Sequence, residues 1–95
     1  MKIAVLGAGM VGSAIALDLS SRHHVTAFDV SENNLALLSK RNPRIETKKT
    51  DLNNHTAYPL LLASFELVVT AVPGFMGYKT LEAVINSGKN VVDIS

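Results

Sequence analysis

The sequence predicts an α/β fold in which helices connect the strands of a parallel sheet. Along the 95 residues, short apolar or β-branched runs alternate with longer segments of helical periodicity, in the order β-α-β-α-β-α-β-α-β. Neighbouring parallel strands need a crossover between them, and an α-helix usually supplies it. A glycine-rich turn after the first run adds the second observation, because such turns often join a strand to a helix.

The first strand and helix have clear local signals. Residues 2–6, KIAVL, form an apolar run that stops at a glycine, which predicts a buried strand. In residues 10–21, apolar side chains recur at four-residue spacing. This pattern predicts a helix with one apolar face, formed by Val11, Ile15 and Leu19.

The second strand and helix follow directly. Residues 24–30, HVTAFDV, are β-branched and aromatic and predict a strand. Ser31 can cap the next helix, because its hydroxyl can accept a hydrogen bond from an N–H group of the first turn. We expect this helix to run to about Lys40, with Leu35 and Leu38 facing the core.

The middle of the chain has weaker signals. Residues 44–50, RIETKKT, alternate only loosely and give the least certain strand. A short helix is expected to start near Tyr58, since Pro59 fits best in a first helical turn. Residues 66–72, ELVVTAV, predict a strongly buried strand.

The carboxy-terminal segment predicts one more helix and strand. Residues 74–88, GFMGYKTLEAVINSG, predict a helix that stops at its final glycine. Leu81, Val84 and Ile85 are expected on its core face. Residues 90–95, NVVDIS, predict the last strand.

Composition sets limits on function. Apolar residues make up 47% and charged residues 18%, a globular balance, and the net charge of +1 gives no general attraction for nucleic acid or membranes. The basic segment 40–49 is interpreted as a solvated loop and edge strand, with a phosphate or nucleic-acid patch as the alternative. Cysteine is absent, which excludes disulfides and thiolate catalysis. No apolar run approaches the roughly 18 residues of a membrane-spanning helix. From these features together, we expect a cytoplasmic domain without nucleic-acid or membrane partners.

The glycines are the clearest functional signal. Gly7, Gly9 and Gly12 form a Gly-x-Gly-x-x-Gly pattern between a predicted strand and a predicted helix. Gly7 would allow the tight turn, Gly9 would let a pyrophosphate approach the backbone, and Gly12 would let the helix pack closely on the strands. The N–H groups of Met10 and Val11 would then face the anion. This context predicts a Rossmann-type doubly wound parallel sheet of about five strands that binds a dinucleotide.

An acid at the end of the second strand supports this interpretation. Asp29 lies 22 positions after Gly7 and could accept hydrogen bonds from the adenosine ribose. The alternative is an aspartate that merely ends a strand before a serine cap. A 2′-phosphate would meet Asp29 and, nearby, Glu32, while Val30 and Ser31 provide no arginine to pair with it. We therefore expect NAD rather than NADP, with Val30 among the cofactor-binding residues.

Two later segments complete the predicted cofactor site. Asp51 could accept from the adenine amino group with Leu52 against the ring, or it could be a capping or loop acid. Ala71, Val72 and Pro73 follow the fourth strand, where ligands of open parallel sheets bind, and are expected beside the nicotinamide. They could equally form a plain strand-to-helix turn.

Catalytic and metal-binding groups are not found in the sequence. His23, His24 and His55 are scattered without metal-ligand spacing, and the first two are expected in solvent. Tyr78 and Lys79 lie near the expected nicotinamide end, but residues at a helix start often point to solvent. We therefore assign no catalytic residue.

Four segments of the chain together resemble the amino-terminal NAD(P)-binding domain of the saccharopine dehydrogenase family, particularly its lysine 6-dehydrogenase and saccharopine-dehydrogenase-like branch. These segments are KIAVLGAGMVGSAIALDL, FDV, TDLNN and AVPGFMGYKTLEAVINSGKNVVDIS. The resemblance implies an oxidoreductase that acts on a carbon–nitrogen bond of an amino acid such as lysine or saccharopine. It also implies pyrophosphate contacts from Gly9, Met10 and Val11 and a ribose contact from Asp29. Adenine contacts are implied for Asp51 and Leu52, and nicotinamide contacts for Ala71 to Pro73.

The resemblance further implies that residues 1–95 are a truncated chain. Family members are several times longer, and their substrate and catalytic residues lie mostly in a later domain, so this part alone is expected to be inactive. The alternative is a regulatory module that senses NAD without catalysis, as in potassium transport, and a ligand-free remnant is a third possibility. The turn AVPGFMG favours the enzyme. A homodimer through the final strand and a half-covered sheet face is also considered.

Overall fold

The structure is a computed structural model that describes residues 1–94. Its elements occur in the predicted order: β1 (Lys2–Leu6), α1 (Met10–Leu19), β2 (His24–Asp29), α2 (Glu32–Arg41), β3 (Glu46–Lys49), the 3₁₀ helix η1 (His55–Ala57), α3 (Tyr58–Leu61), β4 (Leu67–Thr70), α4 (Gly74–Asn86) and β5 (Asn90–Asp93). The strands at 46–49, 67–70 and 90–93 are shorter than predicted. The last predicted strand residue, Ser95, lies outside the described residues.

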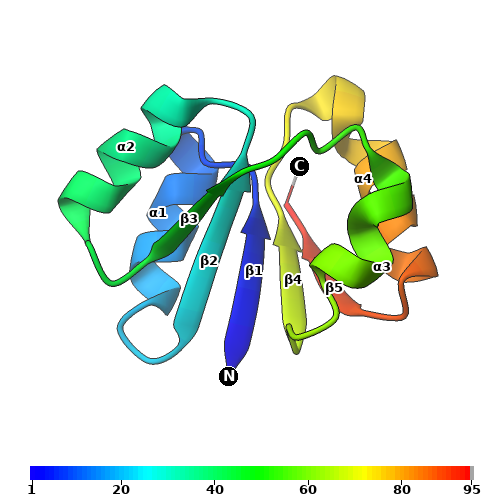
Figure 1. Ribbon diagram of the computed structural model, residues 1–95, viewed down its shortest axis with the longest axis horizontal. Coiled ribbons are helices and arrows are strands. Elements are labelled where there is room, and N and C mark those ends of the chain that lie inside the picture. The colour runs from blue at the N-terminus through cyan, green and yellow to red at the C-terminus, as the bar shows by residue number, and fades with distance from the viewer. Residues whose placement is uncertain (95) are drawn as a thin grey trace.

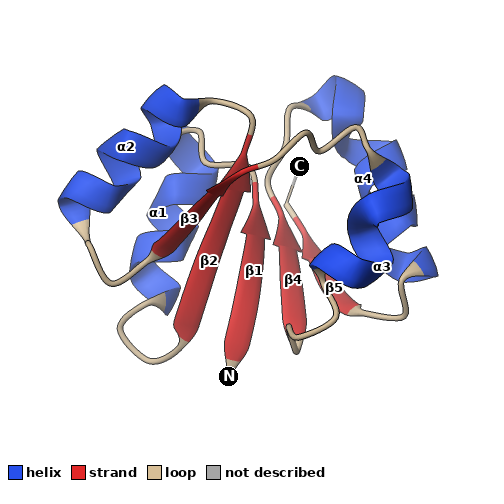
Figure 2. Ribbon diagram, in the orientation of Figure 1, coloured by secondary structure: helices blue, strands red, loops and turns tan. Residues whose placement is uncertain are grey.

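The five strands form one parallel sheet in the order β3-β2-β1-β4-β5 (Figure 1). The chain moves outward from β1 to β3, then returns to β4 on the other side of β1. Figure 2 shows the loops that follow β1, β2 and β4 at one edge of the sheet. The predicted doubly wound fold is confirmed, and its change of direction lies between β1 and β4. Ligands of such sheets bind beside this change of direction.

Side chains alternate between two apolar clusters, one on each face of the sheet. The cluster beneath α1 and α2 contains Ile3, Val5, Ala8, Ala16, Val25, Ala27, Leu35, Leu38, Ile45 and Val69. The cluster beneath α3 and α4 contains Ala4, Leu6, Phe28, Leu52, Tyr58, Leu62, Phe65, Val68, Val72, Ala83 and Val84. Leu35 and Leu38 therefore face the core as predicted.

The predicted apolar face of α1 is wrong at its first position. Val11 is 58% exposed, and the helix buries Gly12 and Ala16 instead. Ile15 and Leu19 are only partly buried against the cluster. Small residues occupy the buried face because the start of α1 packs closely on neighbouring backbone, a contact that hydrophobic periodicity does not encode.

The core face of α4 is also displaced from the prediction. Val84 is buried, but Leu81 is half-buried and Ile85 is 55% exposed. The buried residues of this helix are Gly77, Thr80, Ala83 and Val84. Thr80, Ala83 and Val84 define the core face, and Ile85, which is rotated by about 100° beyond Val84, lies outside it.

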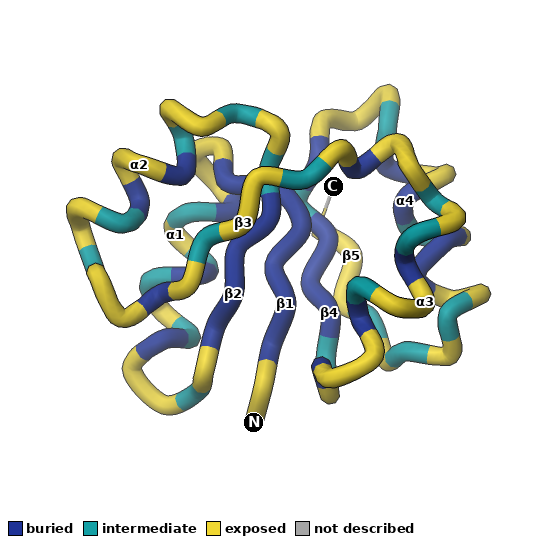
Figure 3. Tube along the Cα trace, viewed as in Figure 1, coloured by how far each residue is buried: buried dark blue, intermediate teal, exposed yellow. Residues whose placement is uncertain are grey.

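Burial is concentrated in the central strands, and both edge strands are largely exposed (Figure 3). On β5, Val91 packs against the cluster beneath α3 and α4, whereas Val92 and Ile94 are about half exposed. The proposed homodimer through this edge stays a prediction. Within residues 1–94, no helix is long and apolar enough to cross a membrane.

Candidate functional site

A cavity of about 670 Å³ opens at the carboxyl ends of the strands. It lies where β1 and β4 are neighbours and the connections diverge, the position expected of a ligand site in an open parallel sheet. Except for Gly12, the predicted cofactor-binding residues all line this cavity: Gly7, Gly9, Met10, Val11, Asp29, Val30, Asp51, Leu52, Ala71, Val72 and Pro73. The fold thus brings together four segments that are far apart in the sequence.

Five further residues that were not predicted also line the cavity: Asn34, Asn53, Phe75, Met76 and Ile94. Three of them, Asn53, Phe75 and Met76, lie within three residues of a predicted position, so their neighbours in the sequence already indicated this region. Asn34 follows the Ser31 cap by one turn of α2. Only the three-dimensional arrangement shows that this turn faces the cavity.

Two of the three glycines are required by close backbone packing. Gly7 has a φ of +105°, and a Cβ there would stand 2.8 Å from the carbonyl carbon of Ala71. A Cβ on Gly12 would stand 2.8 Å from the carbonyl carbon of Gly7. Gly12 therefore brings α1 against the turn itself, rather than only against the strands, and this explains why it is buried away from the cavity.

Gly9 is required by neither conformation nor packing. Its φ is −72°, and a Cβ there would have no atom within 4 Å. As the residue before α1, it offers no side chain to accept a hydrogen bond from the first helical turn. The first-turn N–H groups and the positive end of the helix dipole are therefore left for another acceptor, and Gly9, Met10 and Val11 line the cavity.

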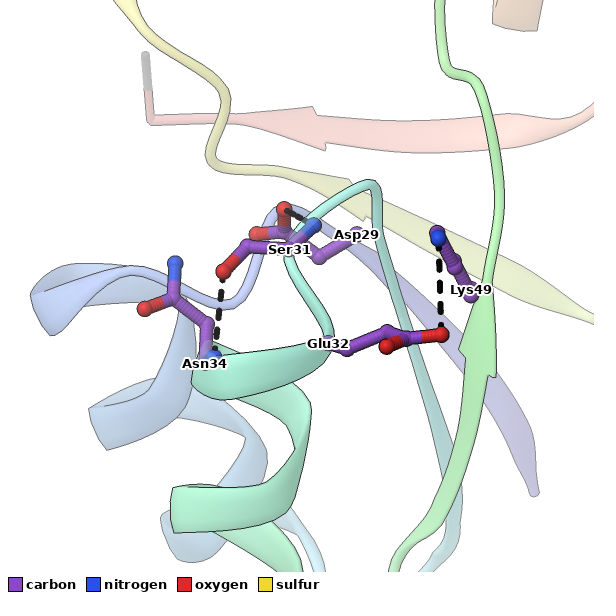
Figure 4. A network of polar contacts seen from close by, with 5 residues as sticks. All are labelled: Asp29, Ser31, Glu32, Asn34 and Lys49. Atoms are coloured by element: carbon purple, nitrogen blue, oxygen red, sulfur yellow. Dashed lines mark hydrogen bonds and ion pairs between the residues drawn. The ribbon is translucent and has the colours of Figure 1, made fainter.

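Asp29, the last residue of β2, connects the glycine turn to α2. Its Oδ2 accepts the Ala8 N–H at 2.7 Å, and its Oδ1 accepts the Ser31 N–H at 2.9 Å. Ser31 caps α2 as predicted, since its Oγ accepts the Asn34 N–H at 3.1 Å (Figure 4). Asp29 thus has the structural role of an aspartate that ends a strand before a serine cap. The same carboxylate also lines the cavity where the ribose is expected.

Glu32, the second acid expected to repel a 2′-phosphate, forms an ion pair with a lysine. The Lys49 Nζ lies 3.4 Å from Glu32 Oε1, and both side chains are largely exposed (Figure 4). Lys49 is the register partner of Asp29 in the β2–β3 pair. The Lys49 ammonium therefore partly offsets the negative charge of Glu32.

Asp51 and Leu52 lie two and three residues beyond β3, which ends at Lys49. Asp51 is exposed, and its Oδ1 accepts the Asn53 N–H at 3.0 Å. The Leu52 side chain is buried, and its carbonyl oxygen accepts the Tyr58 hydroxyl at 2.8 Å. Burial raises the pKa of Tyr58 above its ordinary value of 10.0, and the negative charge of Asp51 acts in the same direction.

The turn after β4 also lines the cavity. The Ala71 N–H donates to the Leu6 carbonyl at 2.8 Å, which holds this turn against β1. Val72 is buried, while Pro73 is the exposed N-cap of α4. Phe75 follows it and is 88% exposed although it lines the cavity.

Catalytic and metal-binding clusters are not found among the described residues. No group of three or more histidines, cysteines or acids there could hold a metal ion. His24 is exposed as expected, but His23 is partly buried, and its Nδ1 is fully buried. Tyr78 and Lys79 are exposed on α4. The arrangement can therefore bind a ligand at the strand ends, where Asp29 and Asp51 are the titratable side chains that line the cavity.

A parallel sheet with a glycine turn and a strand-end acid beside one cavity defines a nucleotide-binding domain of the Rossmann class. The family model described as the saccharopine dehydrogenase NADP-binding domain matches residues 3–95, so the chain belongs to this family. It is an NAD(P)-binding domain of an oxidoreductase family, and the resemblance inferred from the sequence is confirmed. No match was found among curated proteins.

Solved structures share the fold over nearly the whole chain. Saccharopine dehydrogenase (L-Glu forming) from Saccharomyces cerevisiae matches with a TM-score of 0.81 and 22% identity over 99% of this chain and 21% of its own. Arogenate dehydrogenase from Synechocystis has a TM-score of 0.75 and 25% identity, with 100% and 33% covered. UDP-N-acetylglucosamine 3-dehydrogenase from Acidithiobacillus ferrooxidans has a TM-score of 0.77 and 18% identity, over 98% of this chain and 28% of its own. The chain thus spans a third or less of each of these proteins.

Proposed function

We propose that this chain is the NAD-binding domain of a dehydrogenase that acts on the carbon–nitrogen bond of an amino acid such as lysine or saccharopine. The family match supports the reaction class. The observation that carries the binding proposal is Gly9, whose Cβ position is open, next to a helix start without a side-chain cap. A glycine that neither backbone conformation nor protein packing requires is well explained by a ligand that needs its space.

The cofactor is proposed to extend across the strand ends. Its pyrophosphate would accept hydrogen bonds from the backbone at the start of α1, near Gly9. The adenosine ribose would lie against Asp29, and the adenine against Leu52 with Asp51 accepting from its amino group. The nicotinamide would lie by the turn at residues 71–73, since these segments line one cavity.

We propose NAD rather than NADP on the basis of charge. The Asp29 carboxylate lines the cavity, and a 2′-phosphate near it would be repelled. Lys49, the cation in the same network, is paired with Glu32 and does not line the cavity (Figure 4). The name of the family model refers to NADP, so direct comparison of the two cofactors is the informative measurement.

A further domain is proposed to complete the active site. The described residues contain no evident catalytic group, and the solved relatives are much longer than this chain. Large apolar side chains are exposed around the cavity mouth, with Met10 and Phe75 about nine-tenths exposed. Exposed apolar surface of this kind is typical of a face that contacts another domain. We therefore expect residues 1–95 alone to bind cofactor without turnover.

The test is calorimetric titration of the purified domain with NAD and with NADP. We expect binding of NAD, weaker binding of NADP, and loss of at least about tenfold in affinity in Gly9→Val, because the new side chain would occupy the pyrophosphate position. Gly74→Val is the matched control, since Gly74 also has open surroundings but does not line the cavity. Absence of NAD binding, or equal losses in both variants, would reject the proposal.

The second candidate function is a module that senses NAD without catalysis. The observation that favours it is that the two titratable side chains lining the cavity, Asp29 and Asp51, are both proposed to contact the adenosine half of the cofactor. Hydride transfer separates the two functions. A full-length protein that carries this domain should reduce NAD in the presence of lysine or saccharopine if the first proposal is correct, and should bind NAD without reducing it if the second is.

A further inference from the structure

We propose that the Tyr58 hydroxyl is a positioning group that sets the adenine selectivity of the cofactor site. The inference rests on the proposed function, because it concerns the adenine end of the proposed NAD site. Tyr58 does not line the cavity and is not expected to touch the cofactor. It acts through the loop at residues 50–54, which connects β3 to η1.

This loop leaves the sheet and is held by the buried Leu52 side chain and by a small number of hydrogen bonds. At its start, the Thr50 N–H donates to the Asp29 carbonyl at 2.9 Å. Beyond that point, the Asn53 and Asn54 N–H groups bond back to Asp51 within the loop itself. The hydrogen bond from the Tyr58 hydroxyl to the Leu52 carbonyl then links the loop to α3. Without it, the segment with the predicted adenine contacts would lose its hydrogen bond to that helix.

Tyr58 is suited to this role because it is fixed and remains a donor. Its side chain is fully buried in the cluster beneath α3 and α4, and the His55 ring packs edge-on against it at 5.5 Å. The phenol is protonated at neutral pH, as in any tyrosine, and burial raises its pKa further. A protonated hydroxyl in a fixed position holds the Leu52 carbonyl at one place.

The position of this carbonyl determines where the loop places Asp51. The two residues are adjacent and both line the cavity. A carboxylate can accept from the 6-amino group of adenine, but it faces an oxygen if the base is hypoxanthine. A loop held in place should therefore favour NAD over nicotinamide hypoxanthine dinucleotide, and a loosened loop should lose this preference.

The experiment measures both dissociation constants in the wild-type domain, in Tyr58→Phe and in Ser20→Ala. Phenylalanine keeps the buried ring and removes only the hydroxyl. Ser20→Ala is the control, because the Ser20 hydroxyl also donates to a carbonyl, that of Leu17 at 2.8 Å, and does not line the cavity. We expect Tyr58→Phe to reduce the preference for NAD by about fivefold, in keeping with one buried hydrogen bond, and Ser20→Ala to retain it.

The outcomes separate this inference from the proposed function. If the wild type binds neither dinucleotide, the proposed function fails and this inference fails with it. If the wild type binds NAD but shows no preference between the bases, or if Tyr58→Phe keeps the wild-type preference, only the role of Tyr58 is overturned. A double variant with Asp51→Ala provides a second check, because removing Asp51 should leave Tyr58 with little further effect on base preference.

Discussion

The Asp29 carboxylate and the Ala8 backbone N–H are 2.7 Å apart, so the acid that ends β2 holds the glycine turn that follows β1. The other carboxylate oxygen accepts the Ser31 N–H at the start of α2. One side chain thus fixes two of the segments that surround the proposed cofactor. A residue at this position can affect ligand binding both through direct contact and through the shape of the turn.

Asp29→Ala should therefore destabilise the domain even without ligand. The loss of both acceptors leaves two part-buried N–H groups without their partner, and we expect a decrease of about 1–3 kcal/mol in the free energy of unfolding. Urea denaturation monitored by circular dichroism measures it. Asp51→Ala is the control, because Asp51 is exposed and its side chain accepts only from within its own loop. Equal stabilities for wild type and Asp29→Ala would show that the connection contributes nothing.

The glycines predict opposite consequences for two similar substitutions. Gly12→Ala should destabilise the fold by about 1–3 kcal/mol, because its Cβ would collide with the Gly7 carbonyl. Gly9→Ala should leave stability within about 0.5 kcal/mol, since the space around it is open and its φ is unstrained. It should nevertheless weaken NAD binding. Thermal denaturation and NAD titration of both variants test this, and a Gly9→Ala protein with wild-type affinity would contradict it.

The ion pair at the edge of the sheet predicts a change in cofactor preference. Glu32→Gln removes the carboxylate that holds Lys49 and leaves its ammonium free to approach a 2′-phosphate. We expect the ratio of NADP to NAD affinity to rise by up to about fivefold, which corresponds to at most about 1 kcal/mol for an exposed pair. Titration at low and high salt measures the effect. If the ratio of NADP to NAD affinity does not change at low salt, this ion pair does not influence cofactor preference.

Tyr58 predicts a specific loss of stability at high pH. Its pKa is raised in the folded state above 10.0, so the folded protein keeps the phenol neutral where the unfolded chain ionises it. The resulting stability is present below pH 10 and decreases as the pH rises through the folded-state pKa. Tyr58→Phe should show a shallower decrease above about pH 10. Equilibrium unfolding across this range compares the two, and identical pH profiles would reject the prediction.

Much of the fold could be predicted because its signals are local. The run KIAVL, the cap at Ser31 and the proline at residue 59 each fix an element through its own residues, and all three are found as predicted. The strand ends then place Asp29 and residues 71–73 at one edge of the sheet, because parallel strands share their carboxyl ends there.

The remaining features depend on contacts between distant segments. The buried face of α1 consists of small residues because Gly12 packs on the turn at Gly7. Apolar periodicity therefore predicted the wrong position for Val11. The bond between Asp29 and Ala8 joins residues 21 positions apart and has no pattern of its own in the sequence. Likewise, the sequence shows that Tyr58 can start a helix but not that its hydroxyl holds Leu52.

The most direct test of the central claim is a ¹H–¹⁵N chemical-shift titration of the domain with NAD. The account predicts that the largest changes occur at the amides of Gly9, Met10 and Val11, with smaller changes near Asp29 and Leu52. Gly9→Val should abolish these changes. If NAD caused no shifts at saturating concentration, or if its shifts mapped away from the carboxyl ends of the strands, the proposed cofactor site would be wrong.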